Sequence, residues 1–598
     1  MKIKLIKTIS LVLFLCGLAA ANAFAATVTV TKSEDTADGI CDADCSLREA
    51  AVAANNGDVV VFSPLFNSPQ TITLTGGQIT IDKNLTVAGT GANLLSVSGN
   101  NANRIFYISG NAVVALSGMK LTGGRQTTSA DPNGGAIYLT DSTLTLINMM
   151  LSGNKARFTS QPTPPQQPQS RGAGGAVYSK NSALAIINSL INTNDASNGS
   201  GIASTNGVVN VVSSVFNGNI DRSVISSDGI ISVVSSSITN NSGGIGNGGI
   251  LTVDRSIISN NCCFGGVGNS GSAAISKTTL DKNKNIINGG GVFNSGGMSI
   301  KDSTISSNES DRSGGGIYNA GQLTVTNSTV SGNLLLIDPG LTGNSSGGGI
   351  YNTSTGSLIL TNATIANNHA KGLGGGVHQD STGAVTIRNT IIAGNSSSTS
   401  EIDVSGKIVS QGFNLIGNTT GSSGWINSDL LNRNPLLALL GNYGGLTLTH
   451  SLTSGSPAIN AGSNALAVDP ATNNTLQYDQ RGVDYRRAIG GGIGIVDIGA
   501  YESNIPASPV TLSGRVLTSD GRGVSNARIT LMDSNGTIIY AQTSSFGYYR
   551  FVNVPPGTTY TITVSSKRYQ FNSPQVVRID RDRSDLNFVA SLQYRNFI

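Results

Sequence analysis

The chain has 598 residues, of which 76 are glycine, 12% are charged and one is tryptophan. This length allows several domains, and the many small residues suit tight turns better than a helical enzyme domain. The formal charge is +4, but three of the 37 basic residues, Lys2, Lys4 and Lys7, lie in a leader-like segment, which leaves 34 against 33 acidic residues. This balance disfavours nucleic acid or an anionic membrane as the main partner.

Residues 1–25 have the features of a signal peptide. A basic start is followed by an apolar core, residues 9–18, that is too short to span a bilayer, and residues 23–25 read Ala-Phe-Ala, which fits a cleavage site. Cys16 raises the alternative of a lipid anchor, but bulky Leu15 precedes it where a lipobox has a small residue. We expect export and no membrane span in the mature chain, and no segment points to a particular secretion or anchoring partner.

Four cysteines follow the leader. Cys41 and Cys45 enclose three residues, and we expect a small disulfide loop because an exported chain meets oxidising conditions. A metal site is the alternative, but the three histidines of the chain are far away in sequence. Cys262 and Cys263 are adjacent, and both a strained bridge and a pair of buried thiols fit them.

Residues 46–49, Ser-Leu-Arg-Glu, form a capping box that predicts a short helix ending at about Asn55. Further along, an eleven-residue pattern recurs ten times and always ends in Asn. Its first, third and eighth residues are mostly apolar between Ser, Thr and Asn, which indicates short strands with one buried face. The copies are residues 144–154, 184–194, 209–219, 231–241, 251–261, 273–283, 298–308, 323–333, 358–368 and 385–395.

Such a unit cannot bury its apolar face alone, so successive units must stack. The final asparagines lie 20 to 40 residues apart, a period that fits the coils of a right-handed parallel β-helix, and the predicted helix would cover its first coil. Asn amides both donate and accept, so we expect a hydrogen-bonded column along the axis. A second column occupies the fifth position: Asn148, Asn188, Ser213, Ser235, Arg255, Lys277, Asp302, Asn327, Asn362 and Asn389. The glycine runs at 314–316 and 347–349 fit turns.

Two regions depart from the repeat. Residues 161–169 are rich in proline, which predicts a stiff arm that serves as a spacer or presents a ligand. From Pro509 onward, longer alternating strands with hairpin signals predict a β-sandwich. The predicted fold class is therefore all-β: a right-handed parallel β-helix with a short N-terminal capping helix and a C-terminal β-sandwich.

Three motifs resemble known modules of bacterial secreted proteins. Cys45-Ser-Leu-Arg-Glu-Ala50 is the signature of the CSLREA domain, an N-terminal module found before β-helix repeats. The stretches Gly455-Ser-Pro-Ala-Ile-Asn-Ala-Gly462, Asp479-Gln-Arg-Gly482 and Asp497-Ile-Gly-Ala-Tyr-Glu502 resemble the choice-of-anchor Q domain. Residues 547–557 resemble the carboxypeptidase regulatory-like domain, whose fold is immunoglobulin-like and whose role is not catalytic.

The leader, the repeat and these resemblances together imply a division of the chain. We expect a signal peptide at 1–25, a CSLREA-like cap at 26–69, the β-helix at 70–415, a choice-of-anchor Q-like end at 416–503, a linker at 504–508 and the β-sandwich at 509–598.

Enzymatic candidates come from side chains that stacking places together. Arg255, Lys277 and Asp302 follow one another in the fifth-position column, with Asp254 and Lys301 beside them, so that a base would lie next to a carboxylate. The structural alternative is a ladder of stacked side chains in which Asp302 neutralises one of two neighbouring cations. A weaker cluster consists of His378 and Asp380, with His369 one coil away. Asp479, Arg481 and Asp497 also suggest catalysis, but we expect them to form ion pairs and hydrogen bonds that close the last coils.

Three functions remain, and an exported structural or adhesin-like protein that contacts extracellular surfaces or glycans accounts for every feature. A polysaccharide lyase or hydrolase of the pectate-lyase-like type is the first alternative, and calcium as a cofactor enters only with it. A non-catalytic glycan-binding protein is the second, although Trp425 is the only tryptophan available as a sugar platform. We expect no cofactor otherwise.

Overall fold

The computed structural model divides into two compact units, Met1–Gly482 with Ile498–Tyr501, and Val483–Asp497 with Glu502–Ile598. The predicted signal peptide up to residue 24, the proline-rich arm 161–169 and the linker 504–508 lie outside the described residues. The described residues are 25–126, 132–157, 172–336, 345–453, 455–487, 495–503, 510–533, 536–554, 558–572, 574–579 and 582–591.

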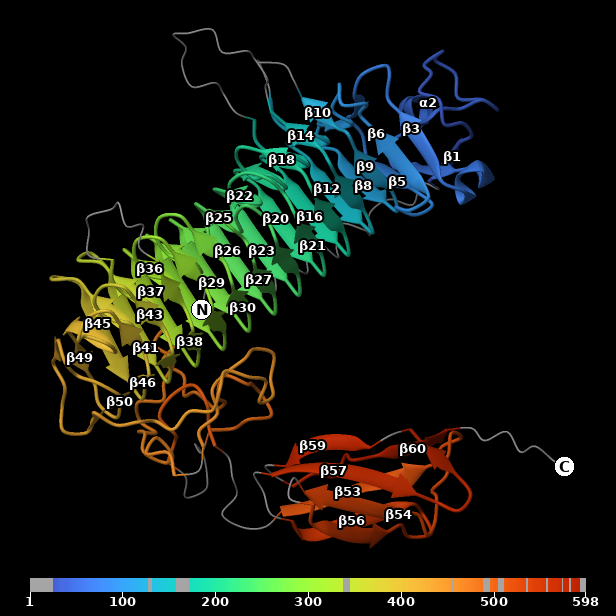
Figure 1. Cartoon of the computed structure of the whole chain (residues 1–598). Coiled ribbons are helices and arrows are strands. Elements are labelled where there is room, and N and C mark those ends of the chain that lie inside the picture. Colours follow the sequence, from blue (N-terminus) through green and yellow to red (C-terminus); the bar gives the residue numbers. More distant parts are fainter. Residues whose placement is uncertain are drawn as a thin grey trace. The chain divides into compact units, whose positions relative to one another are not determined.

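The first unit is a parallel β-helix whose three long sheets run side by side along the rod (Figure 1). Sheet A consists of β1 (Thr27–Val30), β2 (Val59–Phe62), β5 (Leu85–Ala88), β8 (Val113–Ser117), β12 (Thr143–Ile147), β16 (Ala183–Ile187), β20 (Val208–Val212), β23 (Ile230–Val234), β26 (Ile250–Asp254), β29 (Ser272–Ser276), β33 (Gly297–Lys301), β37 (Gln322–Thr326), β41 (Ser357–Thr361), β45 (Ala384–Arg388) and β49 (Val409–Ser410).

Sheet B follows sheet A in each coil. It consists of β3 (Gln70–Thr73), β6 (Leu95–Ser98), β9 (Lys120–Thr122), β13 (Met150–Ser152), β17 (Leu190–Asn192), β21 (Val215–Asn217), β24 (Ser237–Thr239), β27 (Ile257–Ser259), β30 (Thr279–Asp281), β34 (Thr304–Ser306), β38 (Thr329–Ser331), β42 (Thr364–Ala366), β46 (Ile391–Ala393), β50 (Leu415–Ile416) and β52 (Leu430–Leu431).

Sheet C closes each coil. It consists of β4 (Ile79–Ile81), β7 (Phe106–Ile108), β11 (Ile137–Thr140), β15 (Val177–Lys180), β19 (Ile202–Thr205), β22 (Ile225–Ser227), β25 (Ile245–Asn247), β28 (Val267–Asn269), β32 (Val292–Asn294), β36 (Ile317–Asn319), β40 (Ile350–Asn352), β44 (Val377–Gln379), β48 (Val404–Lys407) and β51 (Ser422–Ser423). Two-residue strands form two further small sheets, β10 (Arg125–Gln126), β14 (Lys155–Ala156) and β18 (Asp195–Ala196), and β31 (Lys284–Asn285), β35 (Glu309–Ser310), β39 (Leu334–Leu335), β43 (His369–Ala370) and β47 (Ser396–Ser397).

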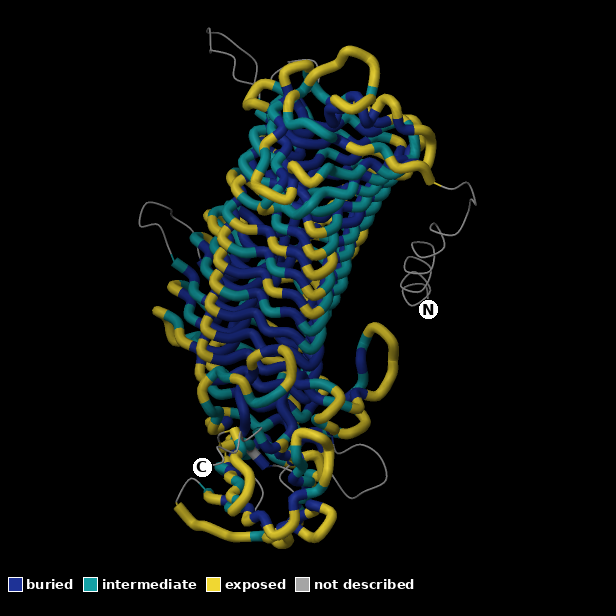
Figure 2. The backbone as a smooth tube through the Cα atoms, turned by 90° about the vertical axis from the view of Figure 1, so that its right-hand side faces the viewer, coloured by how far each residue is buried: buried dark blue, intermediate teal, exposed yellow. Residues whose placement is uncertain are grey.

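The eleven-residue pattern supplies sheets A and B, and the glycine-rich segment between copies supplies sheet C. In the copy at 323–333, the apolar first, third and eighth residues Leu323, Val325 and Val330 are all buried. Their equivalents in the other coils join one continuous core, which appears as buried bands along the tube in Figure 2. The predicted fold class is confirmed.

The final asparagines form the predicted column. In each step the side-chain Nδ2 of one residue donates to the side-chain oxygen of the next at 2.8 to 3.0 Å, from Asn154 to Asn395, and Asp403 accepts the last of these bonds. The backbone N–H of each asparagine donates to the same oxygen, as Asn283 does to Asn308 at 2.9 Å. The amides therefore satisfy turn backbone that the strands leave unpaired.

The fifth-position residues occupy the turn between sheets A and B. All ten have a φ between 47° and 55°, the left-handed region in which Asn is the most favourable residue after Gly. That conformation explains why the position favours Asn. Where it holds Arg255, Lys277 or Asp302, a less suitable residue adopts the same strained backbone.

The N-terminal cap forms as its residues predict. Helix α2 (Leu47–Ala53) has the complete capping box between Ser46 and Glu49, and the 3-10 helix η1 (Pro64–Asn67) follows it. Burial would raise the pKa of Glu49, but hydrogen bonds from the backbone N–H groups of Ser46 and Asp38 and from the Thr36 hydroxyl lower it to about 2. The Cys41–Cys45 disulfide is present.

Residues 434–482 and 498–501, which we call the flank segment, lie against the outer face of sheet B. In coils without this cover the outward residues are open, as Ile257 is 51% exposed, whereas Thr329 in β38 is fully buried. Gln480 joins the flank segment to two strands of sheet B. Its Nε2 donates a hydrogen bond to Thr304 Oγ1 at 3.0 Å, and its Oε1 accepts one from Thr329 Oγ1 at 2.6 Å. Lys301 adds an ion pair with Asp469 at 2.7 Å.

The second unit contains a β-sandwich of two four-stranded sheets. One sheet has the order β56 (Tyr548–Val554), β53 (Val510–Leu517), β60 (Phe588–Ser591) and β58 (Gln570–Phe571). The other has the order β55 (Ile538–Gln542), β54 (Arg528–Asp533), β57 (Thr558–Ser565) and β59 (Gln575–Ile579). Alternating apolar residues of both sheets form its own core, as the hairpin signals predicted.

Candidate binding groove on sheet C

From β7 to β48, the second residue of each sheet C strand belongs to the outer face of the sheet, and strand register aligns these residues in one column. From β7 to β48 the column reads Tyr107, Tyr138, Tyr178, Ala203, Ser226, Gly246, Gly268, Phe293, Tyr318, Tyr351, His378 and Ser405. Rings thus form two groups, Tyr107 to Tyr178 and Phe293 to His378, and four small residues separate them.

The rings stack on one another along the axis. Phe293 lies 5.2 Å from Tyr318 with an angle of 4° between the ring planes, and Tyr318 lies 5.4 Å from Tyr351 at 5°. His378 continues this stack at 5.1 Å and 20°. The other stack is more tilted, and it ends at Tyr178, 5.1 Å from Tyr138. Each interior ring therefore uses both faces within its stack, but Phe293 and Tyr178 have a small residue as their neighbour on one side.

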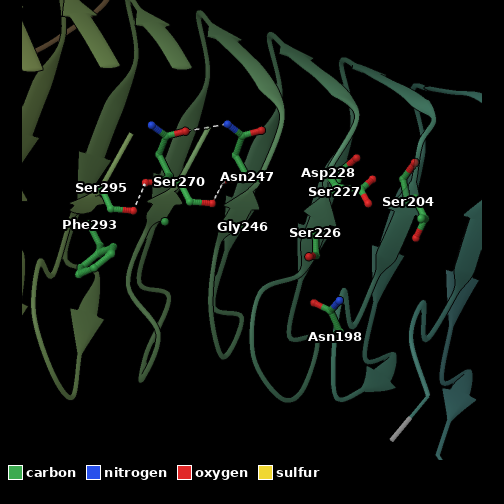
Figure 3. Close-up of a pocket in the computed structure, with 14 residues that line it drawn as sticks. Asn198, Ser204, Ser226, Ser227, Asp228, Gly246, Asn247, Ser270, Phe293 and Ser295 are labelled. Atoms are coloured by element: carbon green, nitrogen blue, oxygen red, sulfur yellow. Dashed lines mark hydrogen bonds between the residues drawn. The ribbon is translucent and has the colours of Figure 1, made fainter. Parts of the chain in front are cut away.

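The interruption between the stacks forms a groove of about 450 Å³ (Figure 3). Gly246 and Gly268 lie on its floor. Neither has a left-handed φ, and a Cβ on Gly268 would meet only the Ile245 carbonyl oxygen, at 4.0 Å. The backbone conformation therefore does not require glycine at Gly268. Gly268 instead leaves this place in the column without a side chain, whereas the next coil has the Phe293 ring at the equivalent place.

Polar side chains line the rest of the groove. Hydroxyl groups come from Ser204, Thr205, Ser226, Ser227, Ser270 and Ser295, and amides come from Asn198, Asn247 and Asn269. Asp228 is the one charged residue of the lining, and its Oδ1 accepts a hydrogen bond from the Asn206 backbone at 2.7 Å. Such a surface offers many hydrogen-bonding groups and no positive charge among the described lining residues.

A second amide ladder ends at this groove. It runs along the end of sheet C through Asn247, Asn269, Asn294, Asn319, Asn352 and Gln379 with bonds of 2.6 to 2.8 Å. Asn247 is its first member because the preceding coils have Ser227 and Ser204 instead. Its Oδ1, buried and without a hydrogen-bond partner, points toward the Ser227 coil in Figure 3. Two columns of sheet C, the ring column and the amide ladder, therefore both change residue type at the groove.

The fifth-position candidates lie on a different side of the rod. Arg255 is exposed and pairs with Asp254 at 2.9 Å, while Lys277 and Asp302 follow in the next two coils at the equivalent turn. Burial raises the pKa of Asp302 to about 6, against the opposing effects of Lys301, Asn327 and Lys277. The flank segment contacts this turn, since Thr447 Oγ1 donates to the Asp302 carbonyl at 3.2 Å. A catalytic site formed by Arg255, Lys277 and Asp302 therefore stays a prediction.

The histidine cluster is divided between sheets. His378 belongs to the sheet C column, where burial lowers its pKa although Asp380 and Glu401 raise it. Tyr351 Oη lies 3.5 Å from Asp380 Oδ2. His369 instead lies in β43 of a small sheet, and its Nδ1 lies 2.9 Å from Ser396 Oγ.

Asp479, Arg481 and Asp497 make short-range polar contacts. Arg481 binds Asp479 at 2.6 Å, and its guanidinium lies 3.8 Å from the centre of the Tyr501 ring. Both residues belong to the flank segment, which covers the side of the coils rather than only their end. Asp497 belongs to the second unit, where its Oδ2 accepts a hydrogen bond from the Ser503 hydroxyl at 2.6 Å.

The cysteines at 262 and 263 are free thiols, and Cys262 is exposed. Of the two interpretations left open, the structure therefore shows thiols, but they are not buried. Within the described residues, no group of three or more His, Cys, Asp or Glu side chains gathers in a way that could hold a metal ion. Among the same residues, no helix has the length and apolarity needed to cross a membrane.

The groove was missed from the sequence although a signal exists. An aromatic residue stands three positions after the second glycine of the pair in Gly134-Gly-Ala-Ile-Tyr138, and the pair Gly314-Gly315 has the same spacing to Tyr318. In the middle copies this place holds Ser226, Gly246 or Gly268. If the glycines are interpreted only as turn residues, the replacement of the aromatic residue by serine or glycine is overlooked.

Comparison with known proteins identifies one domain. Residues 511–591 match the carboxypeptidase regulatory-like domain, which confirms the resemblance of the β-sandwich. No curated protein matches the chain. Among solved structures, pectate lyase Pel9A is similar over 80% of this chain and 97% of its own, with 14% identity and a TM-score of 0.21. This superposition is too loose to transfer any feature of that enzyme.

Proposed function

We propose that this protein is an exported, adhesin-like scaffold whose β-helix binds an extended extracellular polymer along sheet C. The observation that carries the proposal is the groove at the interruption of the aromatic column. Binding grooves combine apolar surface with a few polar groups that fix orientation, and here a ring face meets serine, asparagine and aspartate side chains. The disulfide supports export, because such bonds persist under oxidising conditions.

The scaffold itself supports a role in presentation. Each coil adds one layer to a continuous core, so the outward residues keep a fixed spacing along the rod. A polymer that lies parallel to the axis can then contact several coils at once. The β-sandwich, a domain of its own with a separate core, adds a second element for interaction.

Adhesion of cells that carry the full-length chain tests the proposal. Cells with the chain should adhere to polysaccharide-coated or host-derived surfaces, and the variant Gly268→Phe, which fills the groove, should lower adhesion to the level of cells without it. Gly297→Phe is the matched control, because Gly297 lies on sheet A and a Cβ there meets no atom within 4 Å. Equal adhesion of cells with the original chain, with Gly268→Phe and without the chain would contradict the proposal.

A polysaccharide lyase remains the second candidate, favoured by the raised pKa of Asp302 beside Lys277 in the fifth-position column. In that case Lys277 or Arg255 would accept the sugar proton, and calcium would be the implied cofactor. Incubation with acidic polysaccharides, with and without calcium, and measurement of ultraviolet absorbance from unsaturated products tests it. Activity that Lys277→Ala abolishes would establish the lyase.

A further inference from the structure

The groove on sheet C also indicates the chemical class of its ligand. This inference rests on the proposed function and concerns the same site. The lining combines side-chain hydroxyls and amides with a single carboxylate, Asp228, which is exposed. A polyanionic chain would meet this negative charge without a compensating cation among the described lining residues, and a polyhydroxylated neutral chain would meet hydrogen-bonding groups throughout.

The length of the groove suits a polymer. Its lining extends over five successive coils, from Ser204 in β19 to Ser295 just after β32. Four steps between parallel strands at about 4.8 Å give roughly 19 Å along the axis. Several sugar units in a row would fill this length. A single small molecule would leave most of the lining unused.

Phe293 provides a fixed platform at one end of the groove. One face of its ring is stacked on Tyr318 at 5.2 Å, which holds the ring plane nearly parallel to that of its neighbour. The register partner on the other side is Gly268, so no ring covers that face. Figure 3 shows Phe293 at the end of the groove. The apolar face of a sugar ring packs on an aromatic face of this kind.

Hydrogen-bonding groups along the groove are held in place by the coils. Ser270 Oγ donates to the Asn247 carbonyl at 3.2 Å, and Ser295 Oγ donates to the Asn269 carbonyl at 3.3 Å. Each hydroxyl oxygen can still accept a hydrogen bond from a sugar hydroxyl. Asp228, held by the Asn206 N–H, presents an acceptor in the same groove.

We propose that the groove binds a neutral polysaccharide chain parallel to the axis of the β-helix, with one sugar ring stacked on Phe293. The chain would accept and donate hydrogen bonds at Ser226, Asp228 and Ser270. Since the ligand carries no charge, its affinity should be nearly independent of salt between 0.05 and 0.5 M.

Isothermal titration of the full-length chain tests this inference. The probes are neutral hexasaccharides of glucose, xylose and mannose in β linkage, with hexagalacturonate as the acidic comparison. We expect at least one neutral probe to bind and hexagalacturonate not to bind. Phe293→Ala should weaken binding about tenfold, because stacking contributes roughly this factor. Gly268→Phe should abolish binding, and the control Gly297→Phe should leave it unchanged.

Two outcomes would overturn the inference in different ways. If none of the neutral probes binds, or if Phe293→Leu, which removes the ring but keeps an apolar side chain, binds as well as the original chain, neutral sugar stacking is wrong. If hexagalacturonate binds and Gly268→Phe blocks it, the ligand class is wrong but the polymer-binding groove of the proposed function stands. Circular dichroism of each variant checks that the β-helix has formed.

Discussion

Replacing Asn283 with alanine tests whether the asparagine column holds the coils together. Its Oδ1 accepts hydrogen bonds from the backbone N–H of Asn261 at 3.2 Å and from Asn261 Nδ2 at 2.8 Å. Its Nδ2 donates to the Ile258 carbonyl at 2.9 Å and to Asn308 Oδ1 at 2.9 Å. Asn261, Asn283 and Asn308 are all fully buried, so water cannot replace the lost bonds.

Asn283→Ala removes the acceptor of two buried donors of Asn261. A buried donor without a partner costs about 1 to 3 kcal/mol, so we expect a loss of about 4 kcal/mol in the free energy of unfolding. Coils contact only their neighbours, which confines the damage to this part of the rod. The φ of Asn283 is not left-handed, and strain from the new alanine therefore adds nothing.

Guanidinium denaturation followed by far-ultraviolet circular dichroism measures this loss. The matched control is Asn217→Ala, since Asn217 is exposed in β21 and its Oδ1 accepts only a 3.3 Å bond from Asn240. The control should change stability by less than about 0.5 kcal/mol. If both variants unfold at the same denaturant concentration, the column does not stabilise the stack and our reasoning about the repeat is refuted.

Three further predictions concern the fifth-position turn, the flank segment and the cap. The folded pKa of Asp302, about 6, exceeds the ordinary value of 3.8, so its contribution to stability is full below about pH 4 and is lost as the pH rises through 6. Asp302→Asn should remove this dependence and stabilise the flank segment at pH 7 by up to about 3 kcal/mol, measured by hydrogen exchange at pH 5 and 7; an unchanged pH profile would contradict the assignment. Gln480→Ala should open the flank segment by removing its bonds to Thr304 and Thr329, visible as faster proteolysis within 434–482, whereas an equal cleavage rate would show that these bonds are dispensable. Replacing both Cys41 and Cys45 by serine should destabilise the cap by about 2 kcal/mol through a larger unfolded-state entropy, and a reductant should then have no further effect on its melting.

The rod could be predicted because its determinants are local and repeat. Alternation of apolar residues such as Leu323 and Val325 fixes which side of each strand is buried, and stacking follows because one coil cannot cover its own core. The capping box at Ser46 and Glu49 likewise depends on residues three apart. The second column was also visible, although its physical reason, a left-handed turn, appeared only in the backbone.

The flank segment could not be predicted to lie along sheet B. Its contacts join residues far apart in sequence, as Gln480 meets Thr304, 176 residues earlier. The outward threonines of β34, β38 and β42 look like ordinary solvent-facing residues, because the pattern of a strand does not say what covers it. Asp302 therefore acquires its raised pKa from burial that its own neighbours in sequence do not provide.

By itself, the sequence determined the repeat, the buried face of each strand, the asparagine column and the cap, since each follows from the chemistry of residues within one or two coils. Only the tertiary structure decided that Tyr178 and Phe293 end two ring stacks and that the small residues between them leave a groove. The reason is that coils of unequal length, 20 to 40 residues, hide the common register from a linear reading. Stacking aligns the equivalent residues in a single column on sheet C, and the small residues in that column leave the groove between the two ring stacks.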